Sequence, residues 1–277
     1  MSGRNWYART IFDCDASTVL AGLPGTARGW DRPVMDSADL PTDSTDSVDS
    51  PERVPLRPVT AVVLDVGNVL YAWEAIGAVA GRVPTALWHE FCADADFGSL
   101  NARADAGEPL GDILADLVAA HPDRPEWERI QRLYWDHFED SLTGPVPGMA
   151  PLVDDILAAG APLYALTNFN DVLFAASRRL MPQLARFHGV VVSGAEHLVK
   201  PDPALYRLLL TRYGLDPART LFVDDSPANI DGARSVGLRT HLFTGAGALR
   251  AALADAGLLP PRRHRSAERA ESTATAP

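Results

Sequence analysis

One local pattern recurs along this sequence and limits the folds open to it: a short apolar run, a polar residue, then a helical stretch. Five apolar runs have the length and composition of buried strands: 61–64, 163–166, 190–192, 221–223 and 241–243. The helical stretch Pro203–Tyr213 follows Asp202 as an N-cap and stops at Gly214. The stretch Met149–Ala159 stops at Gly160 in the same way. This alternation predicts an α/β fold built on a doubly wound parallel sheet.

One long interval departs from the alternation. From Trp73 to about Gly148 the sequence shows no strong strand pattern, only apolar residues at helical spacing. A helical insertion after the first strand would lie over the carboxyl end of the sheet and could close a site there. We therefore expect a core domain of residues 57–72 and 146–259 and a helical cap of residues 73–145.

The two ends of the chain differ in composition from the middle. Residues 36–52 contain six acidic residues and no Lys or Arg, with Ser, Thr and Pro between them. Such a segment buries too little apolar surface to offset the entropy lost on ordering. The sequence predicts a disordered acidic leader at residues 1–56 and a disordered tail at residues 260–277.

Composition excludes several classes of partner. A net charge of −11 argues against a nucleic-acid surface, because phosphate backbones are held by clustered Lys and Arg. No apolar run approaches the roughly 18 residues that span a bilayer, so we expect no membrane partner. Cys14 and Cys92 are isolated and fit neither a disulfide framework nor a metal site, which favours the cytoplasm.

Chemically useful side chains stand where three of the predicted strands stop. Asp65 closes the first strand, Thr167–Asn168 closes the second, and Asp224–Asp225 closes the fourth. Lys200 stands just before the helix that starts at Pro203. Open parallel sheets bind their ligands at the carboxyl ends of the strands, so these residues are candidates for one site.

These residue types suit chemistry at a phosphate group. A carboxylate such as Asp65 can attack phosphorus, which divides a difficult displacement into two easier steps. The adjacent Asp224 and Asp225 repel each other, and a cation such as Mg²⁺ relieves that repulsion. Ordinary turns, an N-cap and a solvated lysine would explain each segment alone. The order and spacing of all four segments favour a single site.

In these four segments the chain resembles the haloacid dehalogenase (HAD) superfamily, in the subfamily with a small helical cap after the first strand. The resemblance covers about residues 60–250, and the Asp-x-Gly-Asn-Val form of residues 65–69 is similar to bacterial sugar-1-phosphate phosphatases. It implies a Rossmann-like core, Mg²⁺ as cofactor and a small-molecule phosphate ester as substrate. It also implies that Thr167, Asn168 and Lys200 bind the transferring phosphoryl group and that Lys200 assists catalysis.

The resemblance implies a metal site as well, with one departure from the usual pattern. Asp65 would be the nucleophile and would bind the metal together with the backbone carbonyl of Gly67. Asp225 would be the direct carboxylate ligand, and Asp224 would act through water. Phosphatases of this superfamily usually carry a general acid two residues after the nucleophile, where this chain has Gly67. General acid–base catalysis contributes roughly 10²–10⁴ in rate, so its loss must be explained.

Three explanations for Gly67 stay open. The substrate can have a good leaving group, such as an anomeric sugar phosphate or an aryl phosphate. A residue of the predicted cap can replace the acid, with Glu74, Asp105 and Glu108 as candidates. The third explanation is a weak or inactive enzyme, which would make the chain a binding module.

A second enzymatic alternative is hydrolytic 2-haloacid dehalogenation, in which Asp65 would attack carbon without a metal. The Asp224–Asp225 pair argues against it, because two carboxylates serve a cation and repel a carboxylate substrate.

Overall fold

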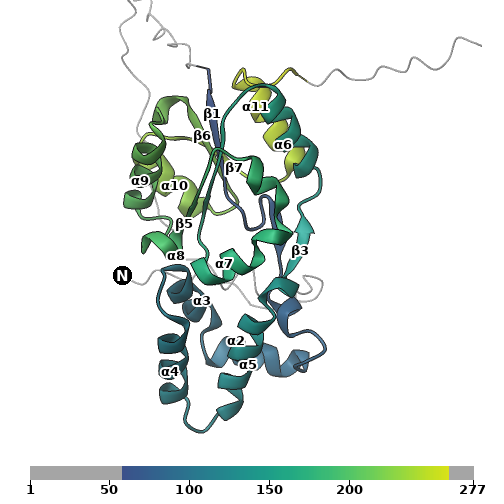
Figure 1. Cartoon of the computed structure of the whole chain (residues 1–277), viewed down its shortest axis with the longest axis vertical. Coiled ribbons are helices and arrows are strands. Elements are labelled where there is room, and N and C mark those ends of the chain that lie inside the picture. The colour runs from purple at the N-terminus through teal and green to yellow at the C-terminus, as the bar shows by residue number, and fades with distance from the viewer. Residues whose placement is uncertain (1–57, 262–277) are drawn as a thin grey trace, which may run out of the picture. The chain divides into compact units, whose positions relative to one another are not determined.

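The computed structural model describes residues 58–261, which contain a five-stranded parallel sheet (Figure 1). The strands lie side by side in this order: β5 (Gly189–Val192), β4 (Leu163–Thr167), β1 (Ala61–Leu64), β6 (Thr220–Asp224) and β7 (Arg239–Leu242). Every neighbouring pair is parallel, which confirms the predicted sheet. The last strand begins two residues before the predicted run 241–243. The predicted leader (1–56) and most of the predicted tail (260–277) lie outside the described residues.

Helices cover both faces of the sheet. On one face, α9 (Pro203–Tyr213) and α10 (Pro227–Ser235) contribute Leu205 and Ile230 to a buried apolar cluster that includes Val63 of β1. On the other face, α6 (Met149–Ala158) and α11 (Ala246–Asp255) lie together (Figure 1). All four residues of β1 are buried, because a central strand with both faces covered must be apolar throughout.

Helix boundaries follow from their capping residues. The Asp202 side chain accepts a hydrogen bond from Ala204 N at 2.8 Å and begins α9, as predicted. Gly214 ends the helix with a φ of +62°, a left-handed conformation that glycine adopts without strain. Ser226 begins α10 by accepting from Asn229 N at 3.4 Å. These caps place the loops that precede α9 and α10 at the carboxyl edge of the sheet.

Four α-helices lie between residues 73 and 142, in the interval that follows β1. They are α2 (Thr85–Asp94), α3 (Phe97–Asp105), α4 (Leu110–Ala120) and α5 (Pro125–Asp136), flanked by the 3-10 helices η1 (Ala75–Val79) and η2 (Phe138–Ser141). We call residues 74–141 the helical insertion and residues 58–70 and 146–261 the α/β core. The insertion packs around buried aromatic side chains: Trp88, Phe91, Phe97, Trp127 and Tyr134. In Figure 1 it lies below the sheet, next to α7 (Asp171–Ser177) and α8 (Ser193–Glu196).

A two-stranded antiparallel ribbon joins the insertion to the α/β core. Its strands are β2 (Tyr71–Trp73) and β3 (Leu142–Pro145). The expectation of no strand between Trp73 and Gly148 was wrong for β3. Gly144 and Pro145 are poor strand formers, and pairing with Ala72 and Tyr71 holds them extended.

Short 3-10 helices complete the α/β core: η3 (Arg178–Leu180), η4 (Pro182–Arg186) and η5 (Pro217–Arg219). Among residues 58–261, no helix combines the length and apolar character needed to cross a membrane.

Candidate active site

Strand register brings the predicted acids to one edge of the sheet. Leu64, the last residue of β1, pairs with Val223 of β6 and Ala165 of β4. The Asp65 N–H then donates to Val223 O at 2.9 Å and continues the ladder past β1. Asp65 and Asp224 therefore leave neighbouring strands side by side.

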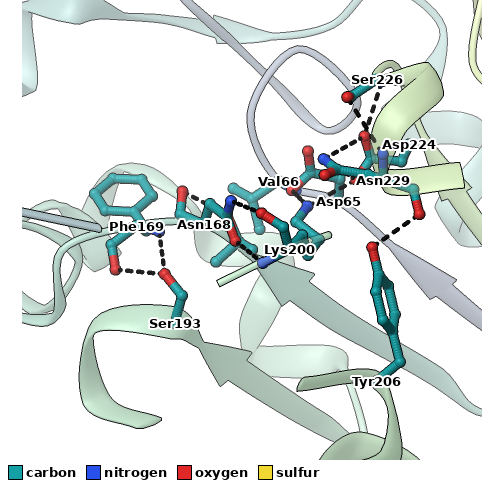
Figure 2. Close-up of polar contacts among 11 residues, drawn as sticks. Asp65, Val66, Asn168, Phe169, Ser193, Lys200, Tyr206, Asp224, Ser226 and Asn229 are labelled. Atoms are coloured by element: carbon teal, nitrogen blue, oxygen red, sulfur yellow. Dashed lines mark hydrogen bonds and ion pairs between the residues drawn. The ribbon is translucent and has the colours of Figure 1, made fainter. Parts of the chain in front are cut away.

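One ammonium group lies between these two carboxylates (Figure 2). Lys200 Nζ is 2.8 Å from Asp65 Oδ1 and 2.7 Å from Asp224 Oδ2. Carboxylate oxygens of Asp65, Asp224 and Asp225 all lie within 4.8 Å of one another. The structure thus gathers three acids and one base that the sequence had separated by up to 160 positions, from 65 to 225.

The Asp224 carboxylate is fully occupied by groups of the protein. It is 0% exposed, and Oδ1 accepts hydrogen bonds from Ser226 N at 2.8 Å and from Asn229 Nδ2 at 3.0 Å. Asn229 Nδ2 also reaches Oδ2 at 3.2 Å. Sequence reasoning missed Asn229, whose only signal was its place in the first turn of α10. Among the described residues Asp225 has no ion-pair partner, so its oxygens are the freer ones for an external cation.

Burial and like charge perturb the acids of this site. Burial raises the pKa of Asp65 to about 7, Asp224 and Asp225 add to the rise, and Lys200 opposes it. Burial and then the charge of Asp224 raise the pKa of Asp225 to about 6. Burial alone would lower the pKa of Lys200, but Asp224 and Asp65 outweigh it and raise that pKa. The site therefore has an excess of negative charge that a cation would neutralise.

Asn168 is tied to Lys200 rather than open to a ligand. Its Nδ2 donates to Lys200 O at 2.9 Å, and its Oδ1 accepts from Lys200 N at 2.8 Å. The side chain therefore fixes the backbone from which the lysine extends, and any contact of Asn168 with substrate would come from its backbone. Thr167 ends β4, one strand from Asp65, and is 1% exposed. Its hydroxyl makes a long contact of 3.5 Å with Asn168 O.

The loop after Asp65 is tight but has room at Gly67. Val66 N donates to Asp65 Oδ1 at 2.7 Å, and Asn68 adopts a left-handed φ of 55°. The Asn68 side chain accepts from Trp73 N at 3.1 Å, which closes the turn. A Cβ atom placed on Gly67 meets no atom within 4 Å. Close packing therefore does not account for the glycine at the position where the resemblance expects an acid.

The three candidate replacement acids have different environments. The Glu108 carboxylate accepts from Arg103 Nε at 2.8 Å, and this hydrogen bond lowers the pKa of Glu108, which suits a permanent anion rather than a proton donor. Asp105 is buried and accepts from Asn101 Nδ2 at 3.3 Å. Glu74 is exposed at the start of the insertion. Of the three, Glu108 is the least suited to replace the missing acid.

The parallel sheet with acids at its carboxyl edge and a helical insertion after the first strand is the architecture of a Rossmann-like hydrolase. The chain belongs to the haloacid dehalogenase-like hydrolase family, whose model matches residues 59–237. The predicted superfamily and fold class are confirmed.

Individual proteins resemble parts of the chain. Over 101 residues it is 34% identical to acyl-CoA dehydrogenase family member 10 of Mus musculus, covering 36% of this chain and 9% of that protein. Over 133 residues it is 30% identical to the N-acetylmuramic acid 6-phosphate phosphatase of Pseudomonas aeruginosa, covering 46% of this chain and 58% of that protein. The chain therefore matches less than two thirds of the length of these relatives.

Solved structures share the fold. A HAD family enzyme of Bacteroides thetaiotaomicron, crystallised as a magnesium complex, gives a TM-score of 0.53 at 16% identity. The alignment covers 69% of this chain and 96% of that one. At this identity the likeness concerns the fold of the chain.

Proposed function

We propose that the protein is a Mg²⁺-dependent phosphatase that hydrolyses a small phosphorylated metabolite through an aspartyl-phosphate on Asp65. The observation that carries the proposal is the cluster of Asp65, Asp224 and Asp225 around Lys200 at the carboxyl edge of the sheet. The phosphatase name of the Pseudomonas aeruginosa relative supports the same class of reaction.

The chain supplies a nucleophile and the means to orient it. An Asp65 oxygen would attack phosphorus, the bond from phosphorus to the leaving oxygen would break, and the leaving group would depart as an anion that takes its proton from water. Water would then attack the aspartyl-phosphate, which releases inorganic phosphate and regenerates the carboxylate. Lys200, 2.8 Å from Asp65, would hold the nucleophile ionised and offset charge on the phosphoryl oxygens. Thr167 and the Asn168 backbone would bind those oxygens from the next strand.

The donor set fits Mg²⁺. This ion prefers a small number of hard oxygen ligands from the protein, which leaves room for oxygens of the substrate phosphate. Asp65, Asp225 and the Gly67 carbonyl would hold it, and Asp224 would act through water because its oxygens already accept protein hydrogen bonds. When bound, the ion would offset charge on the phosphoryl group. The magnesium complex of the Bacteroides thetaiotaomicron enzyme supports this choice.

The same cluster favours phosphate chemistry over dehalogenation. Burial and then the charge of the neighbouring Asp224 raise the pKa of Asp225, so its ionised form is disfavoured without a cation. A substrate with its own carboxylate would add to the repulsion. A phosphate ester that arrives with a divalent cation would relieve it.

Gly67 narrows the substrate class. Because no side chain at this position can protonate the leaving oxygen, the best substrates would be esters whose leaving group departs without a proton. Anomeric sugar phosphates and aryl phosphates meet this condition, and simple alkyl phosphates do not. We expect glucose 1-phosphate and p-nitrophenyl phosphate to react faster than alkyl phosphates.

The test is phosphate release from this panel of esters, with Mg²⁺ and with EDTA. The variants are Asp65→Asn and, as a matched control, Asp231→Asn, because Asp231 is exposed on α10 and pairs with Arg234. Release that requires Mg²⁺, disappears in Asp65→Asn and persists in Asp231→Asn would support the proposal. A folded wild type that releases phosphate from no ester would refute it and favour a non-catalytic module.

A further inference from the structure

The end of helix α3 is capped by the α/β core. The last carbonyls of a helix have no partner inside it and need one elsewhere. Here three consecutive carbonyls of residues 104–106 each lie within hydrogen-bond distance of a core side chain. The contacts are Asn170 Nδ2 to Ala104 O (3.0 Å), Ser193 Oγ to Asp105 O (2.5 Å) and His197 Nδ1 to Ala106 O (3.3 Å). We call Asn170, Ser193 and His197 the carbonyl latch.

The backbone of the helical insertion and the backbone of the α/β core approach each other closely at the latch. A Cβ atom on Gly107 would lie 2.2 Å from Gly194 O, and one on Gly194 would lie 2.7 Å from Asp171 N. No side chain fits at either position. The backbone of the insertion therefore packs directly against the backbone of α8, and α8 packs in the same way against the start of α7. Ser193 is 0% exposed and Asn170 is 3% exposed. Breaking the hydrogen bonds of Ser193 and Asn170 would therefore leave polar groups unpaired away from water, whereas His197 is exposed.

The same residues hold the segment that follows Thr167 and Asn168. Ser193 Oγ accepts a hydrogen bond from Phe169 N at 2.9 Å (Figure 2), and Gly194 N donates to Phe169 O at 3.1 Å. The single proton of Ser193 is directed to the insertion, since Asp105 O is 2.5 Å away and Phe169 O is 3.3 Å away. One hydroxyl thus joins the backbone of the insertion to the backbone of the proposed phosphate-binding segment.

The other two members extend the link. The Asn170 Oδ1 accepts from Val172 N and Leu173 N, both at 3.1 Å, which begins α7 and directs Nδ2 toward the insertion. His197 lies three residues before Lys200 in the same connection. The latch residues therefore lie in or against both the segment that contains Asn168 and the segment that contains Lys200, which the Asn168 side chain links.

We propose that Asn170, Ser193 and His197 are positioning residues that hold the helical insertion against the core and thereby order residues 167–170 and Lys200. Movement of the insertion away from the core would loosen the segment that binds the phosphoryl group, and closure would tighten it. Only the catalytic part of this proposal rests on the proposed phosphatase activity.

Hydrogen exchange of the full chain without ligand tests the link directly. Ser193→Ala removes the bridging hydroxyl, and Asn170→Asp removes the donor to Ala104 but keeps the oxygen that caps α7. The matched control is Ser177→Ala, because Ser177 is buried and its hydroxyl has no hydrogen-bond partner among the described residues. In both latch variants we expect amides of residues 97–108 and of residues 167–171 to exchange about tenfold faster than in the control, as loss of a buried hydrogen bond predicts.

Three results would overturn the proposal. Unchanged exchange at 97–108 would show that the latch does not hold the insertion. Faster exchange there with unchanged exchange at 167–171 would show that the two segments are not coupled. Equal acceleration in the sheet strands β1 and β6 would show general destabilisation instead of a local link.

Kinetics provide the catalytic test. With p-nitrophenyl phosphate and Mg²⁺, we expect Ser193→Ala to lower kcat about tenfold and to change KM less, because the latch orders groups that act on the transferring phosphoryl. An unchanged kcat would contradict the positioning role. If the wild type hydrolyses no ester, the phosphatase proposal fails, and the exchange experiment still decides whether the latch couples the two segments.

Discussion

The side chain of Asn168 makes two reciprocal hydrogen bonds with the backbone of Lys200, which lies 32 positions later in the chain. Its amide donates to the lysine carbonyl and its carbonyl accepts from the lysine N–H. This pair sets the starting point of the lysine side chain, whose ammonium then meets Asp65 and Asp224. Asn168 therefore acts on the site through Lys200.

Asn168→Ala should impair catalysis without removing any charged group. The variant leaves the Lys200 N–H and carbonyl without their partners, so the ammonium loses its fixed position beside Asp65. We expect kcat/KM to fall about 10- to 100-fold, which corresponds to the loss of one or two buried hydrogen bonds. Steady-state phosphate release measures the effect. Asn168→Asp keeps the acceptor for Lys200 N and should fall between wild type and Asn168→Ala; wild-type kinetics in Asn168→Ala would remove the positioning role.

Asp225→Asn should stabilise the metal-free protein. Asp225 is partly buried beside Asp224 and forms no ion pair in the described part of the chain; burial and the charge of Asp224 outweigh the opposing charge of Lys200 and raise the pKa of Asp225 to about 6. Removing its charge should raise the free energy of unfolding in EDTA by about 1–2 kcal/mol, since each pKa unit corresponds to about 1.4 kcal/mol and part of the group is solvated. Urea unfolding with EDTA measures this.

The same variant should lose the stabilisation that Mg²⁺ gives the wild type. Asp231→Asn is the control, because Asp231 is exposed and should change stability by less than about 0.5 kcal/mol. A destabilised Asp225→Asn in EDTA would mean that this carboxylate makes a favourable contact in the metal-free fold.

Stability of the metal-free protein should fall as pH rises through the site's titration. The pKa values of Asp65 and Asp225 rise from 3.8 to about 7 and about 6 on folding. Between 3.8 and those values the folded protein binds more protons than the unfolded chain, so the free energy of unfolding decreases with increasing pH. Surface acids such as Glu108, whose pKa is lowered, act in the opposite direction below this range. Urea titrations in EDTA between about pH 5.5 and 7.5 cover the titration of the site; burial lowers the pKa of His241, which acts in the opposite direction in this range.

Comparing the pH dependence of the free energy of unfolding between the wild type and Asp225→Asn cancels the contributions of the titrating groups that both proteins share. The variant should show a shallower decline than the wild type, because one of the two raised carboxyl groups is gone. A decline of equal slope in both proteins would assign the effect to Asp65 alone. A decline that is steeper in the variant than in the wild type would contradict the raised pKa of Asp225.

Local patterns predicted the parts of the fold that depend on neighbouring residues. The strand that ends at Leu64 is apolar throughout because both of its faces are covered, and Asp202 and Gly214 mark the ends of α9 through capping alone. The gathering of Asp65, Asp224 and Lys200 followed from topology, since parallel strands end at one edge.

Features that depend on distant contacts were not predictable in this way. β3 contains Gly144 and becomes a strand only because β2 pairs with it. Asn229 reaches Asp224 from the next helix, and Ser193 reaches Asp105 from 88 positions away. Such polar contacts have no periodic signal in the sequence, so only three-dimensional packing reveals them.

Gly67→Asp should restore a proton donor at the position where the family resemblance expects one. The structure has open space for the side chain, because a Cβ atom at Gly67 meets nothing within 4 Å. General acids contribute roughly 10²–10⁴ in rate, mostly for poor leaving groups. We therefore expect the ratio of kcat/KM for an alkyl phosphate to that for p-nitrophenyl phosphate to rise at least about tenfold.

The informative control for this variant is Gly67→Asn, which has nearly the same shape and no acid proton. If a proton donor is what the wild type lacks, Asp should change the leaving-group dependence and Asn should not. A similar change in both variants would attribute the effect to loop geometry. An Asp variant that leaves the ratio unchanged while retaining Mg²⁺-dependent turnover would show that leaving-group protonation comes from another group, and the buried Asp105 and the exposed Glu74 would then be the acids to replace next.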